Sequence, residues 1–177
     1  MRRTSMAVLA LLLAAPAGAE PRGYQIGPGS AVIAFRAYGL GLFPIEGTFA
    51  RFAGRLSLDE ADPAFCRLDL RADAASLQMP SADMTADALG PDLLDVGRFP
   101  DVAFKGDCAA GQVQGVLLLH GVSRPLALKV GIAGGRWTAT GLMRRADWGM
   151  GAHPLLAGPE VRLQVTAAVP AGFPARP

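Results

Sequence analysis

The chain has 177 residues, a formal net charge of +2 and a hydrophobic content of 51%. Its 17 basic and 15 acidic residues are interspersed, and the basic clusters on which nucleic-acid binding depends are missing, so a nucleic-acid partner is excluded. The 22 glycines and 14 prolines favour a fold of many short strands joined by turns.

The N-terminus has the pattern of a secretory signal peptide. Arg2 and Arg3 precede an unbroken apolar run, Met6–Ala15, and the small residues Ala17–Ala19 follow it. The run is shorter than the ~20 residues that a membrane-spanning helix needs. We therefore expect cleavage after Ala19 and a periplasmic or secreted protein. The alternative is an N-terminal helix that is buried in the domain.

Cleavage after residue 19 leaves 158 of the 177 residues, enough for one domain with a hydrophobic core. Two of the 17 basic residues leave with the signal peptide, so 15 basic and 15 acidic residues remain and the net charge is about zero. We expect a single domain over residues 20–170 and a flexible, proline-rich tail over residues 171–177.

Alternation of apolar and polar residues dominates the mature chain and predicts β-strands. In Phe65–Asp73, for example, Cys66, Leu68 and Leu70 fall on one face, while arginine and aspartate fall on the other. Glycines and an Asp-Pro step separate such segments. In chain order, the predicted strands span residues 31–38, 43–50, 51–58, 65–73, 101–108, 112–119, 125–132, 136–144 and 161–166.

The segment between Ser81 and Arg98 breaks this pattern, because it is too long for a turn and rich in alanine, leucine and aspartate. Ser81 is a suitable N-cap for a helix. The Gly90-Pro91 step is expected to split that helix into two short pieces, because proline cannot continue a helix. The inner side of this helical insertion is expected to carry Leu89, Leu93 and Leu94.

Antiparallel strands of this kind close into a barrel or pair as a sandwich. The interior of a barrel of about eight strands is either filled by side chains or holds one small ligand. Glycines alternate with large apolar residues on the inward faces, at Gly47, Gly54, Gly106, Gly115 and Gly141. They indicate either an elongated apolar cavity or close contacts between strands, and the sequence does not decide between the two.

The sequence lacks the pattern of a catalytic or metal site. His120, one of only two histidines, lies in a turn in which Gly121 supplies a positive φ and Pro125 fixes the exit. Ser123 lies in the same turn, outside any nucleophile motif of the G-x-S-x-G type. Two histidines and two separated cysteines do not supply the ligands of zinc or a haem attachment motif. We expect a binding protein rather than an enzyme, with no cofactor and no metal.

Three motifs together resemble the YceI-like family. They are G-x-F-x-x-F-x-G-x-L-x-x-D at Gly47–Asp59, P-D-V-A-F-K at Pro100–Lys105 and G-V-L-L-L-H-G-V-S-R-P-L-A-L at Gly115–Leu128. Asp147–Gly149 is similar to the late aromatic-glycine segment of the family. The resemblance extends from Tyr24 to Val169. It implies an exported, all-β, eight-stranded antiparallel barrel, lipocalin-like, with a short helical insertion, that binds a polyisoprenoid or a related long-chain lipid.

The chain departs from the family pattern at two polar positions. The family usually shows Arg-Asp-x-His-Leu in the helical insertion, where this chain has Thr85–Leu89 with neither arginine nor histidine. Tyr38 stands where a histidine is common. If those polar groups hold a lipid head group in the family, this chain lacks that contact, and its ligand has a head group that is smaller, less charged or bound elsewhere.

The resemblance implies a ligand held in the barrel interior. We expect a long-chain isoprenoid or other lipid (a polyisoprenoid, an isoprenoid quinone or a related amphiphile), carried or sequestered, with transient contact with a membrane or a membrane protein. The alternative is a structural or interaction partner of a membrane complex, with a barrel filled by its own side chains, including Trp137. The residues expected to contact the ligand share the inward parity of their strands: Phe35, Phe49, Leu56, Leu68, Leu70, Phe104, Leu117, Leu119, Leu128, Val130 and Val165.

The two cysteines are expected to form a disulfide. Export would place Cys66 and Cys108 in an oxidising compartment, where an even number of cysteines favours pairing. Cys66 opens its strand, and Cys108 closes the strand that follows the helical insertion, so the two lie side by side if these strands are antiparallel neighbours. Both have the inward parity of their strands. The alternative is a pair of buried free thiols.

Overall fold

The computed structural model describes residues 22–59, 65–152 and 158–169. The predicted signal peptide (1–19) and tail (171–177) lie outside the described residues. No helix in the described ranges is both long enough and apolar enough to cross a membrane. The strands are β1 (Arg22–Ile26), β2 (Ala31–Gly39), β3 (Phe43–Phe49), β4 (Phe52–Leu58), β5 (Cys66–Asp73), β6 (Leu77–Gln78), β7 (Asp101–Ala109), β8 (Gln112–Leu119), β9 (Val122–Ala133), β10 (Arg136–Arg144) and β11 (Glu160–Ala168).

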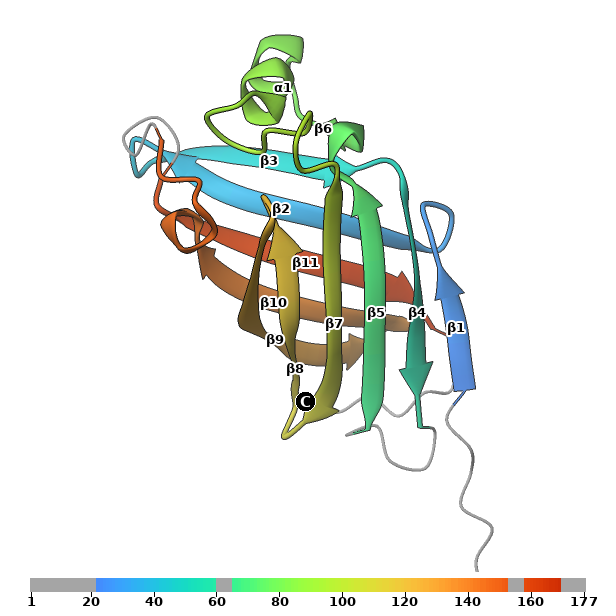
Figure 1. Cartoon of the computed structure of the whole chain (residues 1–177). Helices are drawn as coiled ribbons and strands as arrows, with labels where there is room; N and C mark the ends of the chain where they lie inside the picture. Colours follow the sequence, from blue (N-terminus) through green and yellow to red (C-terminus); the bar gives the residue numbers. More distant parts are fainter. Residues whose placement is uncertain (1–21, 60–64, 153–157, 170–177) are drawn as a thin grey trace, which may run out of the picture.

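These strands form one antiparallel sheet, in the order β1-β4-β5-β7-β8-β9-β10-β11-β2-β3-β6, that curls into a half-barrel (Figure 1). All nine segments of alternating sequence are strands, and the all-β, antiparallel fold is confirmed. The predicted number of eight strands is wrong, because the described residues contain eleven. Beyond the nine, β1 adds an edge strand to β4, and β6 pairs with β3 through two residues only.

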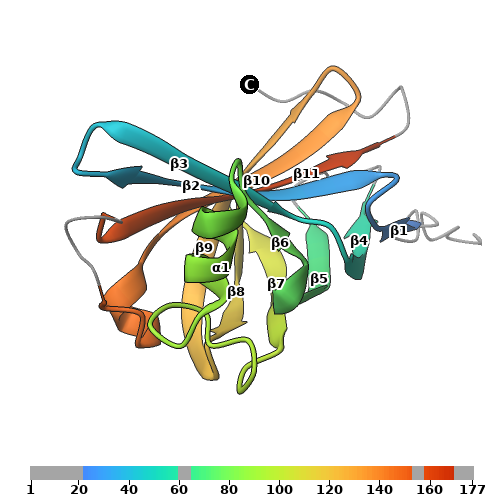
Figure 2. The ribbon, with the colours of Figure 1, turned by 90° about the horizontal axis from the view of Figure 1, so that it is seen from above.

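The sheet has two arms that cross at a steep angle (Figures 1 and 2). Strand β9 belongs to both arms. From Val122 to Lys129 it pairs with β8, and from Lys129 to Ala133 it pairs with β10. Orthogonal arrangements of strands commonly form such a corner with one strand that changes sheets. The curl produced here leaves the inner faces of the two arms turned toward each other.

The β8–β9 turn is tighter than the sequence suggested. It consists of His120 and Gly121, both with positive φ, at 50° and 70°. Pro125 does not fix the exit of the turn, as predicted, but lies inside β9 opposite Val116. Proline is tolerated there because this half of β9 has no pairing with β10, so its missing N–H breaks no ladder on that side.

The helical insertion begins as predicted but contains one helix. Ser81 caps α1 (Ala82–Leu89), and its side-chain oxygen accepts a hydrogen bond from the backbone N–H of Met84 at 3.1 Å. The helix ends at Gly90, whose ψ of 172° is the extended backbone that a following proline favours. The predicted second piece is a series of turns held by backbone hydrogen bonds, such as Phe99 N–H to the Asp95 carbonyl at 2.9 Å.

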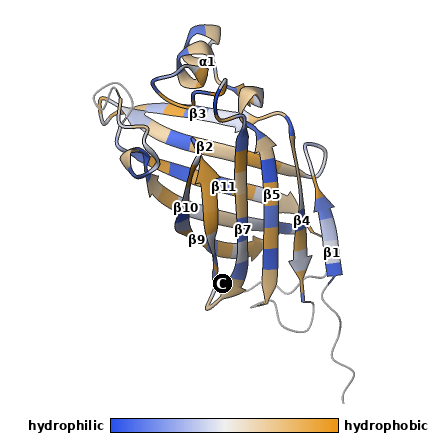
Figure 3. Cartoon of the chain, viewed as in Figure 1, coloured by the Kyte–Doolittle hydropathy of each residue, from blue (hydrophilic) through white to orange (hydrophobic). Residues whose placement is uncertain are grey.

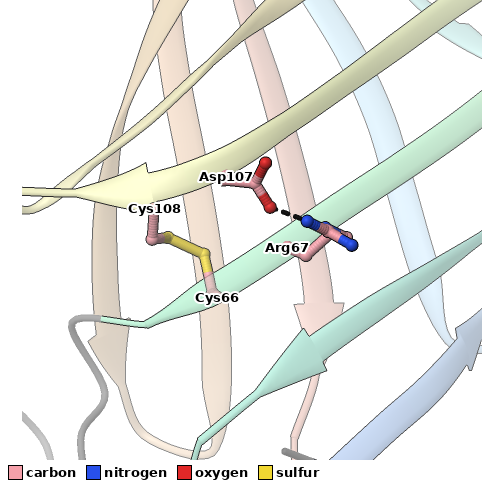
Figure 4. The surroundings of a disulfide bond; sticks show 4 residues. All are labelled: Cys66, Arg67, Asp107 and Cys108. Carbon is pink, nitrogen blue, oxygen red and sulfur yellow. Dashed lines mark hydrogen bonds and ion pairs between the residues drawn. A yellow bond between two sulfur atoms is a disulfide. The ribbon is translucent and has the colours of Figure 1, made fainter.

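The predicted disulfide is present between Cys66 on β5 and Cys108 on β7 (Figure 4). Strands β5 and β7 are antiparallel neighbours, and the adjacent residues Arg67 and Asp107 are partners in the register. The Cα atoms of the two cysteines are 4.8 Å apart, within the range of disulfides. The bond therefore joins the two strands across the helical insertion, at their ends farthest from α1.

Alternation along the strands separates an apolar inner face from a charged outer face, as β5 shows in Figure 3. On the outer face of the β4–β5–β7 arm, Asp69, Asp73, Asp101 and Asp107 each pair with a basic residue that lies opposite or diagonally on a neighbouring strand or at its end. These cross-strand ion pairs are Arg51–Asp73 (2.6 Å), Arg67–Asp107 (2.6 Å), Arg71–Asp101 (2.7 Å) and Lys105–Asp69 (3.2 Å).

Acidification below about pH 4 is expected to destabilise the sheet through this charged face. Hydrogen bonds from their arginine partners hold the pKa of Asp73, Asp101 and Asp107 below the usual value. A carboxyl with a lower pKa in the folded state stabilises the fold above its unfolded pKa, about 3.9, and this stabilisation is lost as the pH falls through the folded pKa. Thermal unfolding measured from neutral pH down to about pH 2 should show the loss. A D73N/D101N/D107N variant should lose less on acidification; an equally steep fall would contradict this cause.

Candidate functional site

A cavity of about 790 Å³ lies between the two arms of the sheet, on the side that α1 covers. Figure 2 shows α1 placed across this open end of the half-barrel. The cavity is lined by side chains from β2, β3 and β5 to β11, and by the segment from Met84 to Leu94. Nearly all of the lining residues are apolar, so the cavity suits an apolar molecule of substantial size.

The opposite end of the half-barrel is filled by its own side chains. Its largest fully buried residues are Trp137, Leu56, Leu58, Leu68 and Val113, and none of them lines the cavity. The boundary is abrupt. On β10, Ala139 lines the cavity and Trp137, one inward position earlier, does not. The half-barrel therefore has a packed floor and an open upper half.

Eight of the eleven residues predicted as ligand contacts line the cavity. Leu56 and Leu68 lie in the packed floor, and Val130 packs against the core below the cavity. All three side chains point inward, as predicted. The alternation along a strand, however, does not reveal how far along that strand the cavity extends. Contact with a ligand stays a prediction for the residues that line the cavity: Phe35, Phe49, Leu70, Phe104, Leu117, Leu119, Leu128 and Val165.

The inward glycines mark close contacts between strands rather than cavity space. A Cβ atom on Gly47 would lie 2.4 Å from the ring of Phe35, and one on Gly115 would lie 2.6 Å from the ring of Phe104. Gly106 faces Gly115 across the β7–β8 pair, where an added Cβ would collide with backbone. Large side chains fold over these glycines, and none of the five inward glycines lines the cavity.

The sequence analysis missed the methionines that line the cavity. All four methionines among the described residues line the cavity: Met79, Met84, Met143 and Met150. Their flexible thioether side chains fill irregular space and adapt to ligands of different shape. They come from four separate segments (a loop, the helix α1, the strand β10 and a second loop), so only the fold brings them together. Only Met143, at an inward position of β10, follows from alternation.

Among the described residues, Arg145 is the one buried charged side chain at the cavity. It begins the 3-10 helix η2 (Arg145–Trp148), and its guanidinium donates to the carbonyls of Met150 (3.0 Å), Ala152 (3.1 Å) and Gly158 (3.0 Å). Burial lowers the pKa of Arg145, because desolvation disfavours its charged form. The side chain thus ties the segment after η2 to the start of β11. Asp87, Asp92 and Gln164 are the other polar lining residues.

The two departures from the expected pattern lie in different places. Ala86, Asp87 and Ala88, in the segment that lacks arginine and histidine, line the cavity beneath α1. Tyr38 is exposed on the outer face of β2 and is not among the lining residues. The missing arginine and histidine therefore change the polarity of the cavity lining beneath α1. Tyr38 does not affect this lining.

His120 is a structural residue of the β8–β9 turn. Its Nδ1 lies 3.0 Å from the carbonyl oxygen of Trp148, and its ring meets the ring of Phe99 edge-on, with centroids 4.6 Å apart. It does not line the cavity. Within the described ranges, no group of three or more histidine, cysteine or acidic side chains is placed to hold a metal ion.

The chain is similar to known proteins over most of its length. A family model described as the YceI-like domain matches residues 24–169. A UPF0312 protein of Vibrio parahaemolyticus is 31% identical over 134 residues, which cover 71% of each protein. A UPF0312 protein of Vibrio vulnificus is 31% identical over 144 residues, which cover 76% of each.

Solved structures share the fold. The crystal structure of BcnA from Burkholderia cenocepacia has a TM-score of 0.65 at 19% identity, covering 79% of this chain and 96% of that chain. A polyisoprenoid binding domain from Saccharophagus degradans, implicated in plant cell wall breakdown, has a TM-score of 0.59 at 14% identity, covering 84% of this chain and 99% of that chain.

Proposed function

The chain belongs to the YceI-like family, and on that premise we propose that it is an exported protein that binds a long-chain apolar lipid in the cavity beneath α1. The ligand class is a polyisoprenoid, an isoprenoid quinone or a related amphiphile, which the protein carries or sequesters without chemical change. The polyisoprenoid-binding domain from Saccharophagus degradans, which shares the fold, supports this class.

The observation that carries the proposal is the cavity itself. Its volume of about 790 Å³ lies in the range of small-molecule sites, and its wall is apolar with few polar groups. Each Å² of apolar surface that a ligand removes from water contributes about 25 cal/mol, so a long hydrocarbon chain gains more here than a compact polar molecule does. The adaptable methionines suit a flexible or irregular chain.

The polar lining residues favour binding over catalysis. Asp87, Asp92, Arg145 and Gln164 are the polar side chains among the lining residues that the structure describes, and three of the hydrogen bonds of Arg145 go to backbone carbonyls. These side chains are suited to bind the polar end of a ligand and so to fix its orientation in the cavity. The alternative, a filled barrel that acts as a structural partner of a membrane complex, accounts for the floor but leaves the upper half unexplained.

Native mass spectrometry tests the proposal directly. Protein purified from its own host is measured under native conditions, and its ligand is then extracted into organic solvent and identified. A co-purified lipid of defined mass that is lost on extraction supports the proposal, whereas repeated empty protein favours the structural alternative. The mass of the denatured chain tests export at the same time, since cleavage after Ala19 removes the first 19 residues.

Ligand binding is expected to slow hydrogen exchange in α1. The helix has only eight residues, none of them buried, and a helix of this length is marginal alone. An apolar chain beneath Met84 and Ala88 would bury one side of the helix and stabilise it. Exchange measured with and without geranylgeraniol should show protection of residues 82–89, with no change in β5, whose backbone is paired on both sides. Unchanged exchange in α1 with bound alcohol would contradict a site beneath it.

A further inference from the structure

The β2–β3 turn concentrates exposed apolar side chains. Eight large apolar side chains are exposed among the described residues, and Tyr38, Leu40, Leu42 and Phe43 are four of them. Leu40, Leu42 and Phe43 are 61%, 78% and 64% exposed. The other four lie singly elsewhere on the chain, as is ordinary for a protein surface. We call residues 38–43 the hairpin tip; it projects outward at the left of Figure 2.

Polarity falls along the hairpin from its base to its tip. Arg36 and Glu46 lie opposite each other at the base and form an ion pair. Tyr38 is the next outward residue of β2, and the leucines and Phe43 follow at the turn. The three steps from Arg36 to Gly39, where β2 ends, extend about 10 Å at the usual rise of a strand. Along the hairpin, charged side chains are followed by a tyrosine and then by aliphatic side chains. The surroundings change in the same order at a membrane surface, from water through the head groups to the acyl chains.

The inner face of the hairpin joins the tip to the cavity. Phe43, Ile45 and Phe49 share the inward parity of β3, and Ile45 and Phe49 line the cavity. On β2, Ala37 lines the cavity two residues before Gly39, where the turn begins. The inner face of these two strands therefore runs from the cavity to the exposed tip without a charged side chain.

We propose that the hairpin tip inserts into the surface of a lipid bilayer and holds the cavity mouth against the acyl chains. Behind the tip, Arg36 pairs with Glu46 and Arg144 with Glu160, while Arg162 of β11, next to Arg36 in the register, adds a single positive charge. Insertion therefore depends on apolar burial rather than on attraction to anionic lipid, and it occurs on neutral membranes with little dependence on salt. Docking of the tip does not depend on which molecule the cavity holds.

The turn geometry provides a variant that leaves the hairpin intact. Leu40 and Gly41 both have positive φ, at 50° and 71°. Asparagine adopts this backbone region more readily than leucine, so Leu40→Asn relieves strain while removing the apolar side chain. Leu42→Ser removes the second leucine. Phe65→Ser is the matched control, since Phe65 is 62% exposed and lies next to β5, at the end of the sheet away from α1.

Co-sedimentation with neutral phosphatidylcholine vesicles tests the docking. The protein is purified after export and its mass is measured first, because an uncleaved apolar N-terminus would itself bind vesicles. Wild type and F65S should bind equally at low and high salt, and L40N/L42S should bind about tenfold more weakly for each leucine removed. All three should contain the same amount of co-purified lipid. Equal vesicle binding by wild type and L40N/L42S, or equal loss in F65S, would overturn the proposal and leave the proposed ligand site untouched.

Fluorescence locates the tip in the bilayer. Both native tryptophans, Trp137 and Trp148, are buried, so a Leu42→Trp variant adds the only exposed indole among the described residues. Its emission should shift to the blue when vesicles are added, and lipids brominated high in the acyl chain should quench it. An unshifted emission would overturn the proposal. A shift that requires membrane proteins, and is absent with protein-free vesicles, would also overturn it and indicate a protein partner.

Discussion

Substitution of Leu117 with tryptophan is expected to reduce lipid retention by about tenfold or more while the sheet stays folded. Leu117 is buried in the cavity wall on β8, so a larger side chain at this position occupies the space proposed for the ligand. Extra volume in a packed core costs about 1–3 kcal/mol of folding free energy. Here the cavity accepts the added ring, so we expect a cost at or below the low end of that range.

The measurement is the amount of lipid extracted per mole of purified protein, together with the midpoint of urea unfolding. Val116→Trp is the control, because Val116 is the preceding residue of β8, points to the outer face and is 48% exposed. Leu70→Trp, on the same wall two strands away across Phe104, should act as L117W does. Folded L117W and L70W proteins that retain wild-type amounts of lipid would show that the ligand lies outside the cavity.

Removal of the disulfide by a C66A/C108A double substitution is expected to cost about 4 kcal/mol of unfolding free energy. The bond joins residues 42 positions apart, and loops of this length lose considerable chain entropy in the cross-linked unfolded state. In a domain of this size the change corresponds to a fall of about 10 °C or more in the melting temperature. The loop contains the whole helical insertion, so both ends of that insertion become less constrained.

Urea unfolding of oxidised wild type, reduced wild type and the double variant measures the cost. The reduced protein and the variant should agree, because both lack the cross-link. Arg67→Ala should have a much smaller effect, since it removes only the exposed ion pair with Asp107 beside the disulfide (Figure 4). Two titratable thiols in denatured, unreduced wild-type protein would show that the bond does not form.

The inward and outward faces of the strands were predictable because alternation is strict on most strands. On β5, every second residue from Cys66 to Ala72 is buried, as the sequence indicates. The disulfide was predicted from expected export, the even number of cysteines and their shared parity, on the condition that the two strands are antiparallel neighbours, and the pairing of β5 with β7 meets that condition. The edge strands were not predictable in the same way. Strand β1 has only five residues, three of them exposed including a glycine, and β6 contributes only Leu77 and Gln78.

The extent of the cavity depends on contacts that alternation does not encode. Leu68 and Leu70 occupy equivalent inward positions on β5, yet one is in the floor and the other in the cavity wall. Trp137, from the other arm, belongs with Leu68 to the fully buried residues of the floor. The role of each leucine therefore depends on what the other arm places at its level, and only the folded arrangement of the arms reveals it.

The packed floor limits the length of hydrocarbon chain that the cavity can bury. A hydrocarbon tail that enters beneath α1 gains affinity with each carbon that it buries, about 0.8 kcal/mol per methylene, until it reaches the layer around Trp137. Carbons beyond that depth stay outside and add nothing, so affinity rises with tail length and then levels off. A smaller residue at position 137 would move the plateau to longer tails. The side chain at position 137 would then determine which tail lengths bind best, because it lies at the depth where the tail stops.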